Sequence, residues 1–330
     1  MSRTVNVILS IDTEADDMWA PGAQLSFRNL DRLPEFQEFC AGLGLRPTYL
    51  VAYEVIGNDR AREVIQQLAR QGNCEIGAHL HAWLTPPYYE ALEPPGKRPY
   101  LHEYPEELRL AKLETVTTAL EQALAARPIS YRGGRWSMDP FTMRALDARG
   151  YLADTTVTPF VSWARTLGTN GRGPNFAGAP YWPYHPAADD PTSPGQFGIL
   201  EVPPSHRPKG IVPYSLYRAL GRRFGNSPRA WRFALRRFLD RLCQVVQPNP
   251  ALAPAAQLLW LAKRVALEKI PVLNLAFHSS ELIAGGAPWL PPSYEERAVR
   301  VALAAVAGLL TQVADWTGST LAQFAQPGAA

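Results

Sequence analysis

The chain has 330 residues, 46% of them hydrophobic, and a formal net charge of +3. A charge this close to balance argues against a general nucleic-acid-binding protein. The three scattered cysteines contain no Cys-x-x-Cys spacing, which argues against a disulfide scaffold and against a cysteine-based zinc site.

Short apolar runs along the chain predict buried strands. The first covers residues 5–11, lacks the features of a secretion signal and is followed directly by Asp12. Similar runs follow at residues 47–52, 74–78, 128–131, 198–202 and 271–277. The longest apolar run, residues 301–310, is about half as long as a membrane span. We therefore expect a cytoplasmic protein.

Helical patterns lie between many of these strands. Residues 59–70 form one, and residues 104–124 form the clearest, with Pro105 at the expected first helical position. The spacing Ser293-x-x-Glu296 predicts a capping box that opens a final helix of about twenty residues. Strands that alternate with helices imply a parallel sheet, open or closed into a barrel.

One region breaks this alternation. Residues 155–197 are rich in glycine, proline, asparagine and aromatic residues, and we expect long loops with little regular structure there. No linker, internal repeat or low-complexity tract divides the chain. The sequence therefore predicts a single domain over residues 1–330.

Polar residues follow four of the predicted strands directly. The carboxyl ends of the strands of a parallel α/β barrel share one face, and active sites form there. We therefore expect these four segments to meet, although they span most of the chain. They are residues 12–14 (DTE), 79–83 (HLHAW), 132–136 (RGGRW) and 278–281 (HSSE).

The first two segments have the composition of a metal site. Residues two apart in an extended chain point the same way, so His79 and His81 could bind one ion. Asp12 and Glu14 would share a side for the same reason. Two imidazoles and one carboxylate suit zinc or a similar divalent ion, and the other carboxylate is left as a base.

The other two segments supply further groups that hydrolysis needs. His278 could protonate a leaving group, and Arg132 could hold a carboxylate in its charged, oriented form. Each motif alone also fits a purely structural role, such as a solvated turn or a histidine packed at a strand end. Their joint position after predicted strands favours a metal-dependent hydrolase.

The same segments resemble the polysaccharide deacetylase, or NodB-homology, superfamily, which is also called carbohydrate esterase family four. The resemblance implies a distorted (β/α)7-type barrel that hydrolyses the acetamide of an N-acetylated sugar, either in a polysaccharide or in its precursor. It runs in the family's order through SIDTE (10–14), EIGAHLHAW (75–83), YRGGRW (131–136), ADTTVTP (153–159), ILEVPPS (199–205) and LAFHSSEL (275–282).

The resemblance also implies roles for single residues. Asp12 matches the general base, His278 the general acid, and Arg132 the arginine that orients the base. Glu14 takes the place of the family's metal-binding carboxylate, and His79 matches its first histidine ligand. The implied cofactor is a divalent metal, with zinc as the first choice.

Two features depart from the family pattern. Thr13 separates two carboxylates that are adjacent in the family, so Glu14 could instead support the site without binding the ion. The family's second histidine falls where this chain has Trp83, so His81 is the predicted second ligand. Trp83 and Trp136 are predicted to contact the substrate.

A basic segment suggests a partner other than the sugar itself. Residues 218–241 carry eight arginines and one acid, interleaved with apolar residues. A basic amphipathic helix in this segment could bind an anionic membrane surface or a phosphate-bearing carrier. The alternative is a solvated helix face with local ion pairs. Two other functions also remain open: hydrolysis of another non-peptide C–N bond, such as a cyclic amide, and carbohydrate binding without catalysis.

Overall fold

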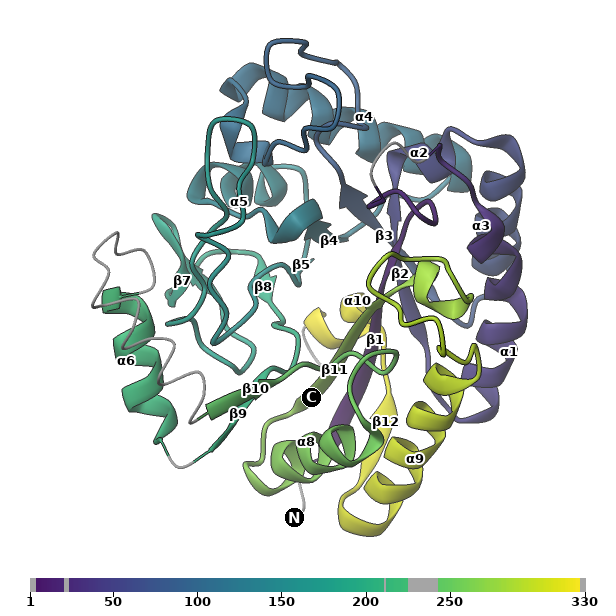
Figure 1. Ribbon diagram of the computed structural model, residues 1–330, viewed down its shortest axis with the longest axis vertical. Helices are drawn as coiled ribbons and strands as arrows, with labels where there is room; N and C mark the ends of the chain where they lie inside the picture. Colours follow the sequence, from purple (N-terminus) through teal and green to yellow (C-terminus); the bar gives the residue numbers. More distant parts are fainter. Residues whose placement is uncertain (1–3, 21–23, 211, 225–242, 327–330) are drawn as a thin grey trace.

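The computed structural model has a parallel sheet that curls into a partial barrel (Figure 1). It describes residues 4–20, 24–210, 212–224 and 243–326. The strands run in the order β11-β1-β2-β3-β4-β5-β8, and β12 pairs with the first residues of β1. Their bounds are β1 (Val5–Thr13), β2 (Pro47–Ala52), β3 (Glu75–Leu80), β4 (Ser130–Gly133), β5 (Ala153–Asp154), β8 (Leu200–Glu201), β11 (Val272–His278) and β12 (Trp316–Gly318).

The predicted fold class is confirmed, because each of the six predicted strands has a counterpart in this sheet. The expected long loops at residues 155–197 are also present, with one short hairpin in them, β6 (Pro186–Ala187) and β7 (Asp190–Pro194). A second small antiparallel pair consists of β9 (Arg207–Gly210) and β10 (Cys243–Val246). Neither pair was predicted from the sequence.

Strand β1 shows how the two faces of the sheet differ. Val7, Leu9 and Ile11 belong to the large apolar core between the sheet and its helices. The alternate residues point into the barrel, because successive side chains of a strand face opposite sides. Ile8 joins a small apolar cluster there, whereas Asp12 makes polar contacts farther along the strand. The barrel interior is therefore apolar at one end and polar at the other.

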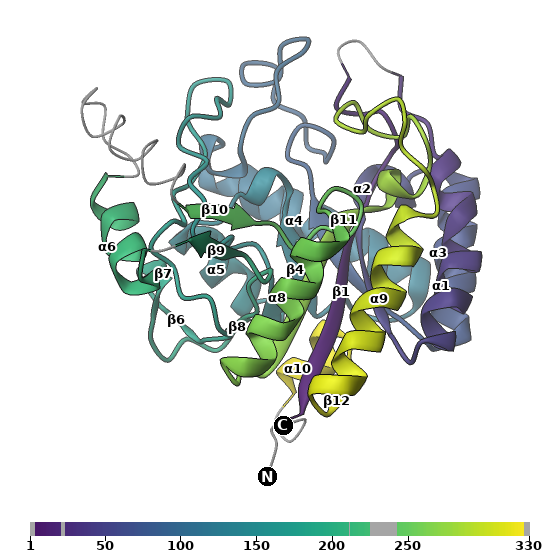
Figure 2. The ribbon, with the colours of Figure 1, turned by 60° about the horizontal axis from the view of Figure 1, so that its bottom comes forward.

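Helices surround the outside of the sheet (Figures 1 and 2). Helices α8 and α9 pack against each other on one side. The helices are α1 (Leu33–Gly42), α2 (Tyr53–Ile56), α3 (Asp59–Gln71), α4 (Glu106–Leu124), α5 (Pro140–Asp147), α6 (Tyr214–Phe224), α8 (Ala255–Leu267), α9 (Ala298–Val313) and α10 (Leu321–Ala325). In Figure 2 the start of β1 and helix α10 lie toward the bottom, and long loops gather at the opposite end.

Local signals explain some helix ends and mislead at others. The side chain of Asn58 caps α3 by accepting a hydrogen bond from the Ala61 amide. Pro105 is the N-cap of α4 rather than its first residue. The predicted capping box at Ser293 is wrong: α9 begins at Ala298 after an N-cap that makes no side-chain hydrogen bond.

The two ends of the curled sheet approach each other inside the barrel. The Ser205 amide donates to the carbonyl of Asn274 at 2.9 Å, and the Asn274 side chain donates to the carbonyl of Val202. Leu321 of α10 belongs to the apolar cluster at the other end of the barrel interior. Within the described ranges, no helix combines the length and the apolar character that crossing a bilayer requires.

Candidate active site and metal centre

The register of the sheet brings the predicted site residues together. Asp12 of β1 is the direct neighbour of His278 on β11, and His79 of β3 is the neighbour of Arg132 on β4. All four lie at the carboxyl ends of their strands. The strand-end prediction is therefore confirmed as a spatial arrangement.

These side chains line a cavity of about 620 Å³. Glu14 and His81, which directly follow β1 and β3, line it as well. One wall comes from residues 161–168, in the long loops after β5. The cavity therefore combines a polar floor at the strand ends with walls made of loops.

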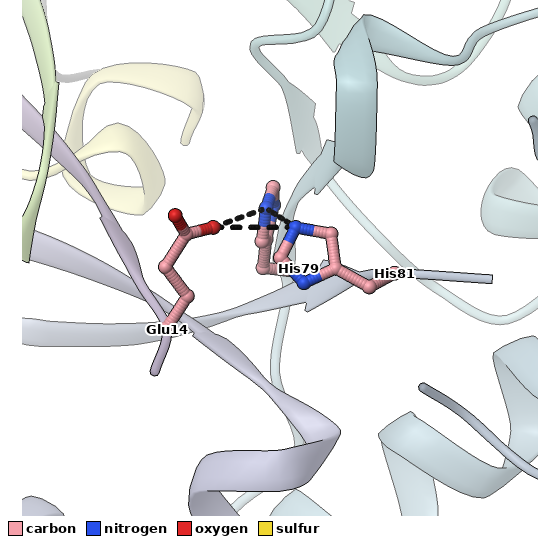
Figure 3. A group of neighbouring side chains, drawn as sticks. All are labelled: Glu14, His79 and His81. Carbon is pink, nitrogen blue, oxygen red and sulfur yellow. Dashed lines mark hydrogen bonds and ion pairs between the residues drawn. The ribbon is translucent and has the colours of Figure 1, made fainter. Parts of the chain in front are cut away.

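Glu14, His79 and His81 form the group within the described residues that could hold a metal ion (Figure 3). The Nε2 atoms of the two histidines lie 3.1 Å apart. Oε2 of Glu14 lies 3.2 Å from Nε2 of His81 and 3.8 Å from Nε2 of His79. Ligand atoms at about 2.0–2.1 Å from a tetrahedral ion are separated by about 3.3 Å, so this triangle has a suitable size.

The other ring nitrogens of the histidines are already bonded. Nδ1 of His79 donates to the backbone carbonyl of Arg132 at 2.9 Å, which leaves Nε2 with a free lone pair. Nδ1 of His81 lies 3.2 Å from Oε1 of Glu54. Metal-binding histidines usually have such a partner, because it fixes both the tautomer and the orientation of the ring.

The surroundings of Glu14, the carboxylate of this triangle, also suit metal binding. Oε1 of Glu14 accepts a hydrogen bond from Trp19 at 2.8 Å, whereas the buried Oε2 has no hydrogen-bond partner. In the metal-free protein the protonated His81, with its Nε2 3.2 Å from this oxygen, compensates the buried charge, and a divalent ion could take that place. The chemistry and orientation of these three side chains therefore fit a divalent ion.

The protonation of the two histidines differs in the metal-free protein. Burial lowers the pKa of His79 to about 4, so its imidazole is neutral at pH 7. Burial opposes the charge of His81 as well, but the carboxylates of Glu54 and Glu14 raise its pKa to about 10. A metal ion that binds His81 therefore has to displace a proton.

Asp12 is held as a carboxylate. Burial alone would raise its pKa, but Arg132, His79 and His278 together lower it below the usual value. The Arg132 guanidinium donates to Oδ1 of Asp12 at 2.6 Å and to the Ser10 hydroxyl. This leaves Oδ2 of Asp12 directed toward His278, whose Nε2 lies 3.7 Å away.

His278, in contrast to Asp12, is held in its protonated, positively charged form. Burial would lower its pKa, but Glu14, Glu281 and Asp12 raise it to about 9, so the imidazolium persists at neutral pH. Oε1 of Glu281 lies 3.4 Å from Nδ1 of His278, and Asn249 and Trp289 donate hydrogen bonds to the same carboxylate. The His278 side chain is 23% exposed, so a ligand in the cavity can reach it.

The glycine pair of the RGGRW segment has a steric reason. A Cβ on Gly134 would lie 2.5 Å from both Cδ2 of His81 and the carbonyl oxygen of Leu80. A Cβ on Gly133 would lie 2.2 Å from the carbonyl oxygen of Ser137. The absence of side chains here lets the turn after β4 pass directly beside the histidine pair.

The two predicted substrate contacts have different surroundings. Trp136 lines the cavity and stacks nearly parallel to Trp163, with ring centroids 6.2 Å apart. Trp83 is not one of the lining residues; its ring contacts those of His81 and Trp19. This geometry favours a role for Trp83 in holding His81 over direct contact with substrate.

Several residues that complete the site have no role predicted from the sequence. Glu54 supports His81, Glu281 faces His278, Trp19 binds Glu14, and His206 lines the cavity. Glu54 is the second residue after β2, so the rule that polar residues near strand ends form the site would have found it. Most of the basic segment lies outside the described residues, and Arg218 and Arg222 of α6 donate hydrogen bonds to the Gly178 carbonyl.

Comparison with known proteins finds matches by structure and none by sequence. Neither a family model nor a curated protein matches the chain. A protein assigned as a polysaccharide deacetylase from Mycobacterium smegmatis has a TM-score of 0.51 and 16% identity, over 98% of this chain and 90% of that one. A protein assigned as a glycoside hydrolase/deacetylase from Parabacteroides distasonis has a TM-score of 0.59 and 12% identity, over 98% and 71% of the two chains.

The same barrel also occurs in a larger enzyme. The 4-α-glucanotransferase of Thermococcus litoralis has a TM-score of 0.53 and 13% identity, and the match covers 98% of this chain and 40% of that one. Similarities at these identities establish the fold. The chain therefore has the (β/α) barrel fold of these deacetylase-like structures, which is the fold that the resemblance of its sequence predicts.

Proposed function

We propose that this protein is a metal-dependent hydrolase that removes the acetyl group from an N-acetylated sugar. The observation that carries the proposal is the convergence of a base, an acid and a metal-ligand triangle in one cavity. The names of the two deacetylase-like structural neighbours support the same reaction class. Glu14, His79 and His81 would hold the ion, with zinc as the first choice.

An ion held by these three side chains would polarise the amide carbonyl and lower the pKa of the attacking water. Oδ2 of Asp12 accepts a proton from that water, while Arg132 occupies Oδ1 and keeps the carboxylate oriented. The oxygen of the water forms a bond to the acetyl carbon. Arg132 contributes to this step by orienting Asp12.

His278 completes the reaction. Its imidazolium gives a proton to the amide nitrogen as the C–N bond breaks, so that acetate and an amine leave. The carboxylate of Glu281 on the Nδ1 side stabilises the charged ring before the transfer. Trp136, beside the guanidinium of Arg132, offers an apolar face to the sugar ring.

The proposal is tested by metal content and acetate release. The zinc-loaded protein should contain one ion per chain and release acetate from N-acetylated oligosaccharides. Asp12→Asn and His278→Ala should each reduce the rate by at least about a hundredfold, because acid–base groups contribute about 10²–10⁴. His185→Ala, at an exposed loop histidine, should not change it. The absence of stoichiometric metal, with no metal restoring activity, would refute the proposal.

Two rival functions use the same residues. A hydrolase of cyclic amides would keep the dependence on Asp12 but would release no acetate from sugars. A carbohydrate-binding protein without catalysis would show no turnover, and its Asp12→Asn variant would bind glycans as well as the wild type does. A single domain and a cytoplasmic location, both expected from the sequence, stay predictions.

A further inference from the structure

Three cationic side chains form part of the cavity lining and are absent from the mechanism: Lys97, Arg98 and Arg135. Lys97 and Arg98 lie in the segment between β3 and α4, and Arg135 lies in the turn after β4. In the part of the chain that the structure describes, none of the three is ion-paired with a carboxylate. Arg132, by contrast, is paired with Asp12.

Neutral groups hold the two arginines in place. Arg98 donates to the carbonyl of Met18 at 2.8 Å and lies over the ring of Trp19. Arg135 donates to the carbonyl oxygens of Arg98 and Leu167 and lies over the ring of Tyr100, 4.0 Å from its centroid. These contacts fix the position of each guanidinium, and neither one forms an ion pair with a carboxylate among the described residues. Glu103 attracts Arg135 only at longer range.

The backbone at Arg135 is held in an uncommon conformation. Arg135 has a φ of 56° and Trp136 a φ of 58°, in the left-handed region that residues with a side chain rarely adopt. Strain of this kind often marks a functional site, and here both residues line the cavity.

We propose that Lys97, Arg98 and Arg135 bind a phosphate group carried by the N-acetylated sugar. The inference rests on the proposed function and adds the charge class of its substrate. The acetamide would lie over Asp12 and His278, and the phosphate would lie against the three cations. Planar guanidinium groups suit phosphate oxygens, and a basic cleft concentrates anions.

The number of charges favours phosphate over the alternatives. A phosphate monoester carries a charge of about −1.5 to −2 at pH 7, whereas a carboxylate carries only about −1. A neutral polysaccharide would leave all three cations uncompensated. Lys97 is exposed to solvent, so the phosphate could belong to a free sugar phosphate or to the linkage of a larger carrier.

The test is calorimetric binding to the full-length protein, both metal-free and zinc-loaded, which does not require turnover. The probes are N-acetylglucosamine, its 1-phosphate, UDP-N-acetylglucosamine and N-acetylmuramic acid. The 1-phosphate should bind at least about tenfold more tightly than the neutral sugar, as expected for charged hydrogen bonds. This advantage should shrink with added salt. Tighter binding of the UDP-sugar would identify a diphosphate carrier as the source.

Substitutions then assign the effect to these side chains. Lys97→Gln should reduce the phosphate preference by about two- to fivefold, as for an exposed ion pair, and Arg98→Gln by about tenfold. Arg172→Gln, at an exposed arginine that does not line the cavity, is the matched control and should leave the preference unchanged. Lys97 is solvent-exposed, so its substitution should not disturb folding.

Each outcome decides the inference separately from the proposed function. Equal affinity for the 1-phosphate and the neutral sugar overturns it, and so does an equal loss in Arg172→Gln. N-acetylmuramic acid bound as tightly as the 1-phosphate overturns the choice of phosphate. A phosphate preference without acetate release supports the inference and refutes the deacetylase. Acetate release from neutral chitotetraose without any phosphate preference overturns the inference and supports the deacetylase.

Discussion

Nδ1 of His81 lies 3.2 Å from Oε1 of Glu54, and both side chains are buried. The carboxylate therefore holds the ring so that Nε2 faces Glu14 and His79. Partners of this kind are a recurrent part of metal sites, because they fix the tautomer and raise the basicity of the ligand. Glu54 connects α2 to the candidate metal centre although it binds no ion itself.

Glu54→Gln should weaken metal binding by about 10- to 100-fold, the usual cost of losing such a partner. The amide keeps the size of the side chain but cannot supply the charge that orients the His81 ring. Competition with a chromophoric chelator measures the dissociation constant directly. Glu296→Gln, which removes a partly exposed carboxylate paired with Arg32, is the control and should bind metal as the wild type does. Wild-type affinity in Glu54→Gln would contradict this role.

Metal binding should also depend on pH in a definite direction. His81 carries a proton in the metal-free protein, because Glu54 and Glu14 raise its pKa to about 10 in spite of burial. Binding an ion at Nε2 releases that proton, so the affinity should increase by up to about tenfold per pH unit between pH 6 and 8. Calorimetry in buffers of different ionisation enthalpy should count about one proton released per ion. Equal affinities at pH 6 and 8 would show that His81 is not a ligand.

The parts of the site that the sequence predicts are those that one local rule covers. Each strand that carries a site residue ends with polar side chains, and parallel pairing brings those ends together. The spacing of two residues correctly predicts that His79 and His81 share a side, since both Nε2 atoms face Glu14. These features follow from the alternation of side chains along a single strand.

Other features depend on contacts between distant residues. Strand β5 has only two residues, too few for a periodic pattern, and it was not predicted. The apparent capping box at Ser293 fails because Glu296 instead accepts from the Ala284 amide and pairs with Arg32, far away in the sequence. The Glu54–His81 contact likewise depends on the packing of separate strands.

Gly134 should be essential for the geometry of the histidine pair. In Gly134→Ala the new methyl group would lie 2.5 Å from Cδ2 of His81, so either the ring or the turn must move. We expect a loss of stability of about 1–3 kcal/mol, typical of overpacking, together with weaker metal binding. Gly308→Ala is the matched control, because that glycine lies in α9 with open space around it. The control should gain up to about 1 kcal/mol.

Denaturant unfolding and chelator competition on both variants test this pair of predictions. Chelator competition separates displacement of the ring from general destabilisation, because metal affinity is measured under conditions where both variants are folded. Gly134→Ala protein with wild-type stability and wild-type metal affinity would show that the turn absorbs the methyl group without moving His81.

A second buried acidic pair, Asp154 and Glu201, lies on neighbouring strands away from the cavity lining. Burial and the adjacent Asp154 raise the pKa of Glu201 well above its usual value. Burial also raises the pKa of Asp154, against the effect of its hydrogen bonds. The folded protein therefore releases a proton at a higher pH than the unfolded chain does.

The pH dependence of stability follows from this difference. The contribution of Glu201 is fully present below its unfolded pKa of about 4.5 and decreases as pH rises toward the folded value. Glu201→Gln cannot ionise, so its free energy of unfolding should fall less between pH 5 and 9 than that of the wild type. Urea denaturation at several pH values measures both curves, with Glu63→Gln on the exposed face of α3 as the control. If the curves of Glu201→Gln and the wild type run parallel, Glu201 is ionised in the folded state, and the raised pKa is wrong.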